Sequence, residues 1–164
     1  KDVTAVRRRE SFPEYASGTE RWVDVSVITG TLVAYEGEQA LFATLTSVGK
    51  DRLGEEQTDP RVTQRGDFFV VSKHVTALNA NVKGFANRVE IYDTPWTLEL
   101  SSGQIIHGAY WHNRFGIEHG PGNIQLSPSD ARWLWQWSEP EVPSGWHAVT
   151  DLSEQEGLRV HIRK

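Results

Sequence analysis

The stretch IIHGAYWHNRFGIEHGPGNIQLSPSDARWLWQW, residues 105–137, decides the fold of this chain. Residues 104–111 are rich in β-favouring types and predict a strand. Three glycines follow closely, at 116, 120 and 122, and predict a tight turn, because glycine reaches backbone angles closed to other residues. Ser127-Pro128-Ser129-Asp130 has the residue types of a helix start, with a serine N-cap and a proline in the first turn. The stretch therefore predicts strand, turn and helix in that order.

The predicted helix places its tryptophans on different faces. Leu134 and Trp137 recur at helical spacing with Trp133 beside them. We therefore expect Trp133 and Trp137 to lie in the core. Trp135 falls off that face and is the candidate for an exposed contact. The proline-rich residues 139–143 are predicted to end the helix.

This order of elements resembles the catalytic core of the L,D-transpeptidases, the YkuD-type family, which crosslink bacterial peptidoglycan through a cysteine acyl-enzyme. Residues 107–116 (HGAYWHNRFG) match the family pattern H-G-x-Y-W-H-x-x-F-G, and residues 126–134 (LSPSDARWL) match L-S-P-x-D-A-x-W-L. The resemblance extends over about residues 21–149. It implies a mostly β fold with one main helix, a YkuD-like β-sandwich of mixed sheets with the helix after the active-site turn.

Between the two matches the chain departs from the family pattern S-H-G-C-h-N. Aligned without gaps, that pattern falls on residues 120–125, so Asn123 takes the place of the cysteine and Pro121 that of the neighbouring histidine. Gly122 keeps the family glycine, and His107 keeps the histidine that serves the family as general base. The chain contains no cysteine, so a shifted register restores no nucleophile. A thiolate is a strong nucleophile, whereas an amide nitrogen is delocalised and barely nucleophilic.

The resemblance implies a groove beside this turn. The vestiges of the active site are predicted to be His107, Asn123, Gly122 and Pro121. The predicted binding residues are His107, Tyr110, Trp111, His112, Trp96 and Asn123. Trp146 joins the three aromatic residues of that set as a candidate groove wall, and packing in the core is the alternative for at least half of the four.

Two of these residues have a plain structural alternative. His107 either binds a ligand or fixes the turn through a backbone hydrogen bond. Asn123 either lines an oxyanion-type pocket with its N–H or simply tolerates a tight turn. His112 is expected to support packing and hydrogen bonds around the site, and His119 to lie on the surface of the turn.

Zinc is the alternative chemistry for the histidines. Imidazole suits zinc, and three ligands plus water make a hydrolytic site. The spacing of His107, His112 and His119 matches no known zinc signature, and the resemblance predicts that these side chains diverge. We therefore predict no metal site and no cofactor.

The composition narrows the remaining possibilities. The chain has 164 residues, enough for one domain with a real core, and its formal charge of −5 gives no basic surface for nucleic acid. No apolar run is long enough to span a membrane. The absence of cysteine excludes disulfides and thiolate metal sites. The chain begins at Lys1, and we expect a mature fragment or an excised domain.

The rest of the chain predicts an arm, strands and loops. Residues 1–20 are expected to be an N-terminal arm or linker, and 21–164 the L,D-transpeptidase-like domain. Residues 23–27 alternate and predict a half-buried strand, followed by a two-residue turn at Thr29-Gly30. Further strands are predicted at 31–36, 39–47, 67–74, 88–92, 97–100, 145–149 and 158–162. Residues 51–65 are predicted to be a loop, and 75–87 a less regular stretch that resembles the family's flap.

Three hypotheses for function follow. The leading one is a catalytically inactive L,D-transpeptidase-like domain that binds a peptidoglycan stem peptide or an envelope protein partner. The second is a cell-wall hydrolase, carboxypeptidase or transferase of altered mechanism, in which His107 activates water. The third is a structural or assembly module that presents the sheet edge within residues 21–47. The resemblance implies a periplasmic or other extracytoplasmic location.

Overall fold

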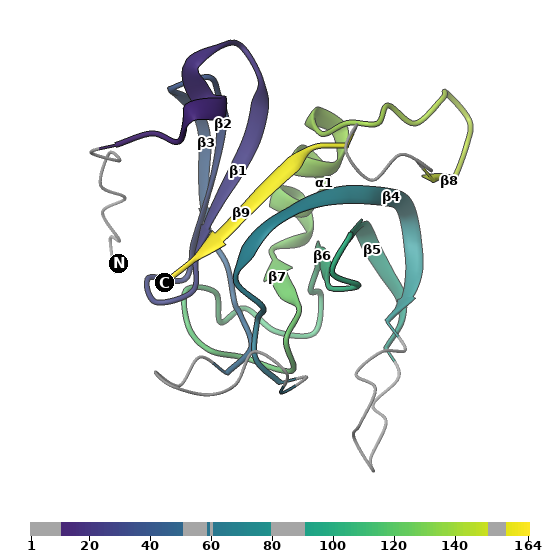
Figure 1. Ribbon diagram of the computed structural model, residues 1–164. Coiled ribbons are helices and arrows are strands. Elements are labelled where there is room, and N and C mark those ends of the chain that lie inside the picture. The colour runs from purple at the N-terminus through teal and green to yellow at the C-terminus, as the bar shows by residue number, and fades with distance from the viewer. Residues whose placement is uncertain (1–10, 51–58, 60, 80–90, 151–156) are drawn as a thin grey trace.

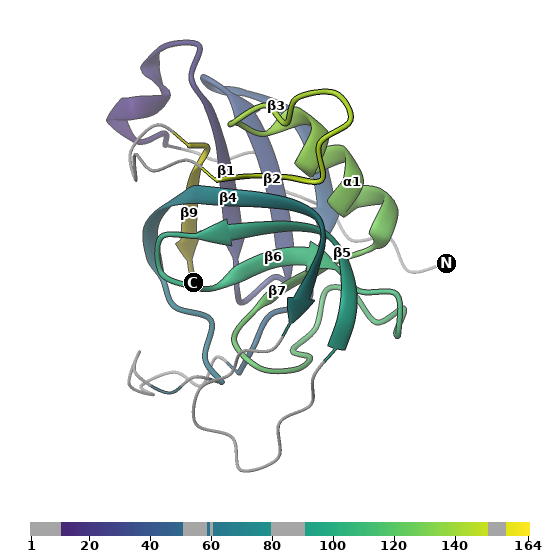
Figure 2. The same cartoon turned by 90° about the vertical axis from the view of Figure 1, so that its right-hand side faces the viewer.

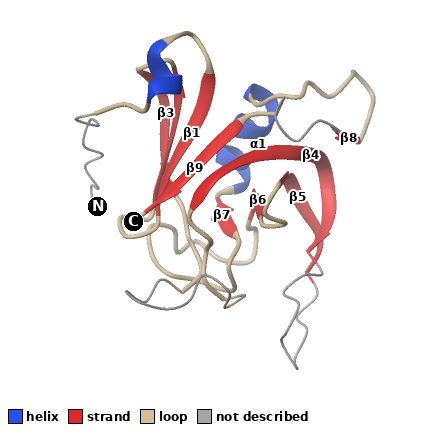
Figure 3. Cartoon of the chain, viewed as in Figure 1, coloured by secondary structure: helices blue, strands red, loops and turns tan. Residues whose placement is uncertain are grey.

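The computed structural model describes residues 11–50, 59, 61–79, 91–150 and 157–164. Most of the secondary structure in these residues is β-strand, and there is one main helix (Figures 1 and 3). In chain order the elements are η1 (Glu14–Ser17), β1 (Arg21–Ser26), β2 (Thr31–Glu36), β3 (Gln39–Leu45), β4 (Gly66–Asn79), β5 (Ile91–Leu100), β6 (Ile105–Gly108), β7 (Ile124–Leu126), α1 (Pro128–Trp137), β8 (Ala148–Thr150) and β9 (Arg159–Arg163).

The strands form a mixed sheet in the order β3-β2-β1-β9-β4-β5-β6-β7, with β8 paired to β4. The pairs β1–β9 and β6–β7 are parallel, whereas neighbours such as β1–β2 and β4–β5 are antiparallel. Ser47, just after β3, exchanges both backbone hydrogen bonds with Gln125 of β7, so the two ends of the strand order meet. The expected mostly β architecture with one main helix and mixed pairing is confirmed.

Helix α1 packs against strands from both ends of the strand order, β3 at one end and β5, β6 and β7 at the other (Figure 2). It contacts β5, β6 and β7 on one side, and Trp133 stacks on Phe42 of β3 at 4.1 Å between ring centroids on the other. The main core lies between the helix and the strands. It includes Val25, Ile106 and Leu134, all fully or almost fully buried. No helix among the described residues is long and apolar enough to cross a membrane.

The helix begins and ends where the sequence predicts. The Asp130 N–H donates to the Ser127 hydroxyl at 3.2 Å, Pro128 is the first helical residue, and the helix ends just before residues 139–143. The Asp130 carboxylate accepts a hydrogen bond from Thr44 at 2.7 Å and so ties the helix start to β3.

The assignment of the helix tryptophans was wrong for Trp135. Its side chain is 9% exposed and packs edge-on against Trp96 at 5.3 Å, whereas Trp133 and Trp137 lie partly exposed at the margin of the core. The buried face follows Ala131, Leu134 and Trp135, a stripe at positions i, i+3 and i+4. This stripe is the face of the helix that packs into the main core.

Strand β1 is buried on both faces, so the expectation of a half-buried strand was wrong. On one face the segment around η1 covers it: Tyr15 packs edge-on against Trp22, with 5.6 Å between ring centroids. Trp22 stacks on Tyr35 of β2 at 4.5 Å. Asp24 is buried as well, with its carboxylate 2.9–3.1 Å from the Arg163 guanidinium. Pairing with Arg163 offsets part of the free-energy cost of burying the Asp24 carboxylate.

Several strand bounds also differ from the prediction. The β1–β2 loop spans Val27 to Gly30, since Ser26 pairs with Thr31. Strand β4 continues to Asn79, so the described part of the predicted irregular stretch is extended, and residues 80–90 lie outside the described residues. Strand β5 is continuous where two pieces were predicted, and β6 ends at Gly108, three residues before the predicted end. Smaller differences are that β3 ends at Leu45 and that β8 spans Ala148–Thr150. Most of the predicted loop at 51–65 lies outside the described residues.

Candidate functional site

His107 lies on β6 and is fully buried. Its Nδ1 lies 3.2 Å from the carbonyl oxygen of Gly108, so Nδ1 carries the hydrogen and Nε2 is the basic nitrogen. Trp111 stacks on the imidazole with 5.6 Å between ring centroids. The backbone hydrogen bond that was the structural alternative for this residue is therefore present.

The pKa of His107 is lowered from 6.5 to about 4. Burial is the main cause, because it disfavours the charged imidazolium. The hydrogen bond to Gly108 opposes that change, and the proximity of His112 adds to it. The imidazole is therefore neutral at neutral pH and is a weak base.

Asn123 ends the glycine turn, by which we mean residues 116–123, and is 7% exposed. Its side-chain oxygen accepts a hydrogen bond from the Ile105 N–H at 3.2 Å, and its own N–H donates to the Pro121 carbonyl. The neighbouring Gly122 carbonyl accepts hydrogen bonds from Gln104 Nε2 at 2.6 Å and from Thr63 Oγ1 at 2.9 Å. In this arrangement the N–H that an oxyanion pocket would use is directed into the turn itself.

The pairing of β6 and β7 fixes how these groups lie relative to one another. The parallel register sets Gln125 directly opposite His107 and Ile124 opposite Ile106. Asn123 directly precedes β7, in the bend that ends the glycine turn, and its side chain accepts from the N–H of Ile105, the first residue of β6. His107 thus lies within β6, and Asn123 lies just before the first residue of β7, the parallel neighbour of β6.

The predicted aromatic residues separate into two groups. Tyr110 is 59% exposed and packs edge-on against Trp111 at 5.0 Å, so these two rings accompany His107. Trp96 instead contacts the helix, through Trp135 and the Arg132 guanidinium 5.4 Å above its ring. Trp146 is 64% exposed, in the segment before β8. Tyr110 and Trp111 are therefore the aromatic candidates for contact with a ligand beside His107.

The sequence reasoning missed Gln125. Its side-chain oxygen lies 2.6 Å from His112 Nε2, and its side-chain nitrogen donates to the His119 carbonyl at 3.1 Å. The imidazoles of His112 and His119 stack with 4.0 Å between ring centroids. A signal was present, because the gap-free alignment sets Gln125 on the asparagine of S-H-G-C-h-N. No group of three His, Cys, Asp or Glu among the described residues is arranged to hold a metal ion.

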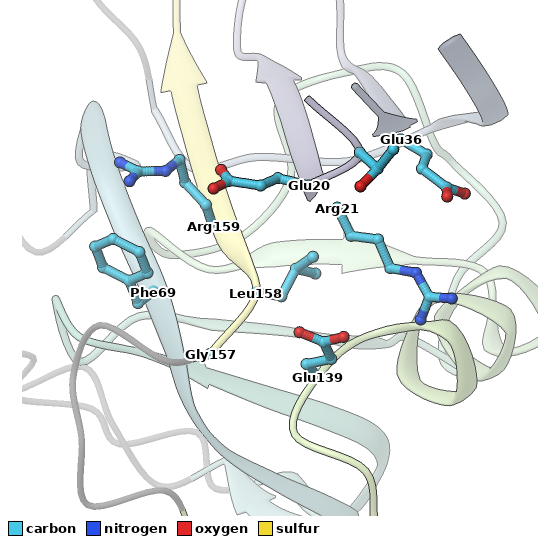
Figure 4. A pocket seen from close by; sticks show the side chains of 9 residues that line it. Glu20, Arg21, Glu36, Phe69, Glu139, Gly157, Leu158 and Arg159 are labelled. Carbon is cyan, nitrogen blue, oxygen red and sulfur yellow. The ribbon is translucent and has the colours of Figure 1, made fainter. Parts of the chain in front are cut away.

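A separate cavity of about 470 Å³ lies where β1, β4 and β9 meet the segment after α1 (Figure 4). Arg159 lies over the rings of Tyr15 and Phe69, at 4.3 and 4.7 Å, and Arg21 lies over Trp137 at 5.5 Å. Both guanidinium groups therefore contact aromatic rings at the rim. The lining consists of Thr19, Glu20, Arg21, Glu36, Phe69, Glu139, Gly157, Leu158 and Arg159. None of these residues belongs to the glycine turn or to β6.

Comparison with known proteins identifies the family and the fold. The family model of the YkuD L,D-transpeptidase catalytic domain matches residues 20–162. A solved L,D-transpeptidase from Mycobacterium smegmatis is 17% identical with a TM-score of 0.63, over 88% of this chain and 59% of that one. An Enterococcus faecium L,D-transpeptidase, solved as a cysteine-to-serine mutant, is 18% identical with a TM-score of 0.65, over 89% and 50%. The catalytic domain from E. faecium, solved by NMR, is 18% identical with a TM-score of 0.61, over 88% and 98%.

At these identities the solved structures show a shared fold. The chain spans 59% of the mycobacterial protein and 50% of the longer enterococcal one, but almost all of the isolated catalytic domain. Comparison with curated proteins finds no match.

Proposed function

The chain belongs to the L,D-transpeptidase catalytic-domain family and contains no cysteine, and from this premise we propose that it is a catalytically inactive member. In this proposal it binds a peptidoglycan stem peptide, or an envelope protein partner, without forming an acyl-enzyme. It would do so in the periplasm or another extracytoplasmic compartment, where peptidoglycan is found.

The observation that carries the proposal is that residue 123 is a buried asparagine. In the gap-free alignment this is the position of the nucleophile, and here it holds a buried amide that accepts a hydrogen bond from the Ile105 N–H. An amide neither ionises near neutral pH nor attacks a carbonyl readily. The loss of one member of a covalent catalytic unit lowers the rate by about 10⁶ in one well-studied protease.

The chemistry of His107 argues against the hydrolase alternative. A general base works best when its pKa lies near the working pH. The pKa of His107 is about 4, so its imidazole has little tendency to take a proton from water at neutral pH. The buried ring is better suited to supporting Trp111 than to activating a water molecule.

Peptide binding is favoured by the exposed groups beside His107. Tyr110 and Trp111 form an edge-to-face pair of which Tyr110 is largely exposed. Large aromatic rings contribute most to binding when a ligand covers them, and they lose little conformational freedom in doing so. A peptide lying over residues 110–111, just after β6, would cover both rings.

Retention of the purified protein on isolated sacculi at low salt tests the proposal. We expect the wild-type protein to be retained, and the Tyr110→Ala/Trp111→Ala variant to lose at least about tenfold in affinity, the effect of removing a pair of binding anchors. Ile28→Ala is the control, because it removes an exposed apolar side chain from the loop after β1. Absence of wild-type retention would reject the stem peptide as the ligand.

A further inference from the structure

The side chains of His112, His119 and Gln125 connect the glycine turn to β7. We call these three side chains the histidine clasp. The two imidazoles are stacked with an interplanar angle of 23°. Gln125 joins them, since its side-chain oxygen meets His112 Nε2 and its side-chain nitrogen donates to the His119 carbonyl. The turn packs closely on this amide, because a Cβ atom at Gly120 would lie 2.7 Å from Gln125 Nε2.

The hydrogen bonds require His112 to be neutral. The Arg114 N–H donates to His112 Nδ1 at 3.1 Å, so Nδ1 is an acceptor and carries no hydrogen. The hydrogen then lies on Nε2, which donates to the Gln125 oxygen at 2.6 Å. A second proton can enter only at Nδ1, where it breaks the bond to the Arg114 backbone.

The surroundings of the second ring, His119, disfavour a positive charge. His119 Nδ1 is buried and has no hydrogen-bond partner among the described residues. Burial, His112 and the Arg114 guanidinium all lower the pKa of His119, in that order of size. The carboxylate next to it in sequence, Glu118, is exposed to solvent. The segment opposite meets the turn through the carbonyl groups of Thr46 and Val48, which accept from the Gly116 and His119 N–H groups and carry no charge.

The clasp is attached to the candidate site through Gln125. The backbone of Gln125 is held on both sides, by His107 across the parallel pair and by two hydrogen bonds to Ser47. Its side chain is therefore the part that is free to change partners when the rings change charge. His107 itself stays neutral down to a pH of about 4, so it does not take part in a change at mildly acidic pH.

We propose that the histidine clasp is a pH-sensitive latch. With both rings neutral, Gln125 holds the turn against β7. A proton on His112 sets a positive charge face to face with the second imidazole and near Arg114, removes the acceptor at His112 Nδ1 and releases the turn next to His107. The latch is a property of the protein alone. Its consequence for ligand binding rests on the proposed function.

NMR of the wild-type protein between about pH 8 and pH 5, where histidine ordinarily titrates, tests the latch without any ligand. At the upper pH we expect His112 to carry its hydrogen on Nε2. On acidification the Gln125 side-chain NH₂ signals should shift together with the His112 and His119 ring signals, in one coupled transition. A hydrogen on His112 Nδ1 at the upper pH, or Gln125 signals that stay constant while the rings titrate, would overturn the proposal.

Two variants separate the latch from a general effect of acid. His112→Gln/His119→Gln should abolish the pH dependence of the Gln125 signals, because neither replacement titrates. His147→Gln removes an exposed histidine outside the turn and should leave the transition unchanged. If the double variant does not fold, the wild-type titration still decides.

The link to binding is a separate measurement. Retention on sacculi should weaken at least about tenfold between the upper and the lower pH, which corresponds to one pKa unit of coupling. If the protein is retained equally at both pH values while the NMR transition occurs, the latch stands and its control of the site is rejected. If the wild-type protein is never retained, the proposed function fails and the NMR result still decides the latch.

Discussion

Asn123 shows how one residue changes the chemistry of the whole site. The gap-free match to the family pattern sets it at the position of the cysteine, and in the structure its side-chain oxygen accepts a hydrogen bond from the backbone N–H of Ile105. The amide thus ties the end of the turn to the start of β6. A residue at the place of a nucleophile has become part of the framework.

Restoring the missing groups should restore reactivity if the gap-free register is right. We expect Asn123→Cys/Pro121→His to give a thiol that a carbapenem acylates, since the family's cysteine is susceptible to that class. Intact-protein mass spectrometry would show the addition. Ser129→Cys, on the exposed side of the helix start, serves as the control and should remain unlabelled. An unreactive thiol at position 123 would argue against the register.

The buried His107 should make stability depend on pH. Its folded pKa of about 4 lies below the ordinary 6.5, so between these values the unfolded chain binds the extra proton and the folded protein does not. Stability therefore falls as the pH drops through this window, by up to about 3 kcal/mol.

His107→Gln should flatten that dependence. Urea unfolding at the two ends of the window measures it, with the exposed His147→Gln as the control. An equally steep loss of stability in His107→Gln would contradict the assignment.

Among the elements, the start of α1 was predicted correctly from the sequence, whereas the face that it buries, which includes Trp135, was not. The Ser127 cap and Pro128 lie next to each other in sequence, so local chemistry is enough to predict where the helix begins. Which face of the helix is buried depends on the strands that pack around it. Those strands are distant in sequence, so the residues near Trp135 give no indication that its side chain is buried. The same limit explains β6, which ends at Gly108 because its partner β7 ends at Leu126, just before the helix.

Replacing Trp135 tests the revised face of the helix. Trp135→Ala should lower the free energy of unfolding by about 3–5 kcal/mol, because it empties a site between Trp96 and Lys73, whose Nζ lies 4.9 Å from the ring. Trp146→Ala, at an exposed position, should change it by no more than about 0.5 kcal/mol. Chemical denaturation of both variants gives the comparison, and equal small effects would refute the burial of Trp135.

For the whole molecule, the segment before β1 matters more than its sequence indicates. Residues 1–20 were predicted as an arm or linker because they are polar and charged. Phe12 and Tyr15 nevertheless pack edge-on against Trp22, at 6.5 and 5.6 Å. Two separated aromatic residues give no periodic signal, so only the fold shows that they cover the second face of β1.

Removing these two rings should destabilise the domain. Phe12→Ala/Tyr15→Ala exposes Trp22 and Tyr35 and should cost about 3 kcal/mol, with a red shift of tryptophan fluorescence. Ile28→Ala is the control, because that side chain is already 62% exposed. A double variant as stable as the wild-type protein would show that the segment contributes nothing to the core.

Short, continuous motifs predicted the family, the capped helix and the strand that holds His107. Gln125 and the stacked His112 and His119 were missed as a unit, since their contact depends on how the turn folds back on β7. What the sequence predicts best is therefore the scaffold of the site, and what it predicts least is the network within it.

The most direct test of the central claim is a muropeptide analysis of sacculi after prolonged incubation with the wild-type protein. Binding without turnover predicts a composition identical to that of untreated sacculi. A new crosslink or a released amino acid, absent when His107→Ala replaces the wild-type protein, would contradict the account and establish an enzyme.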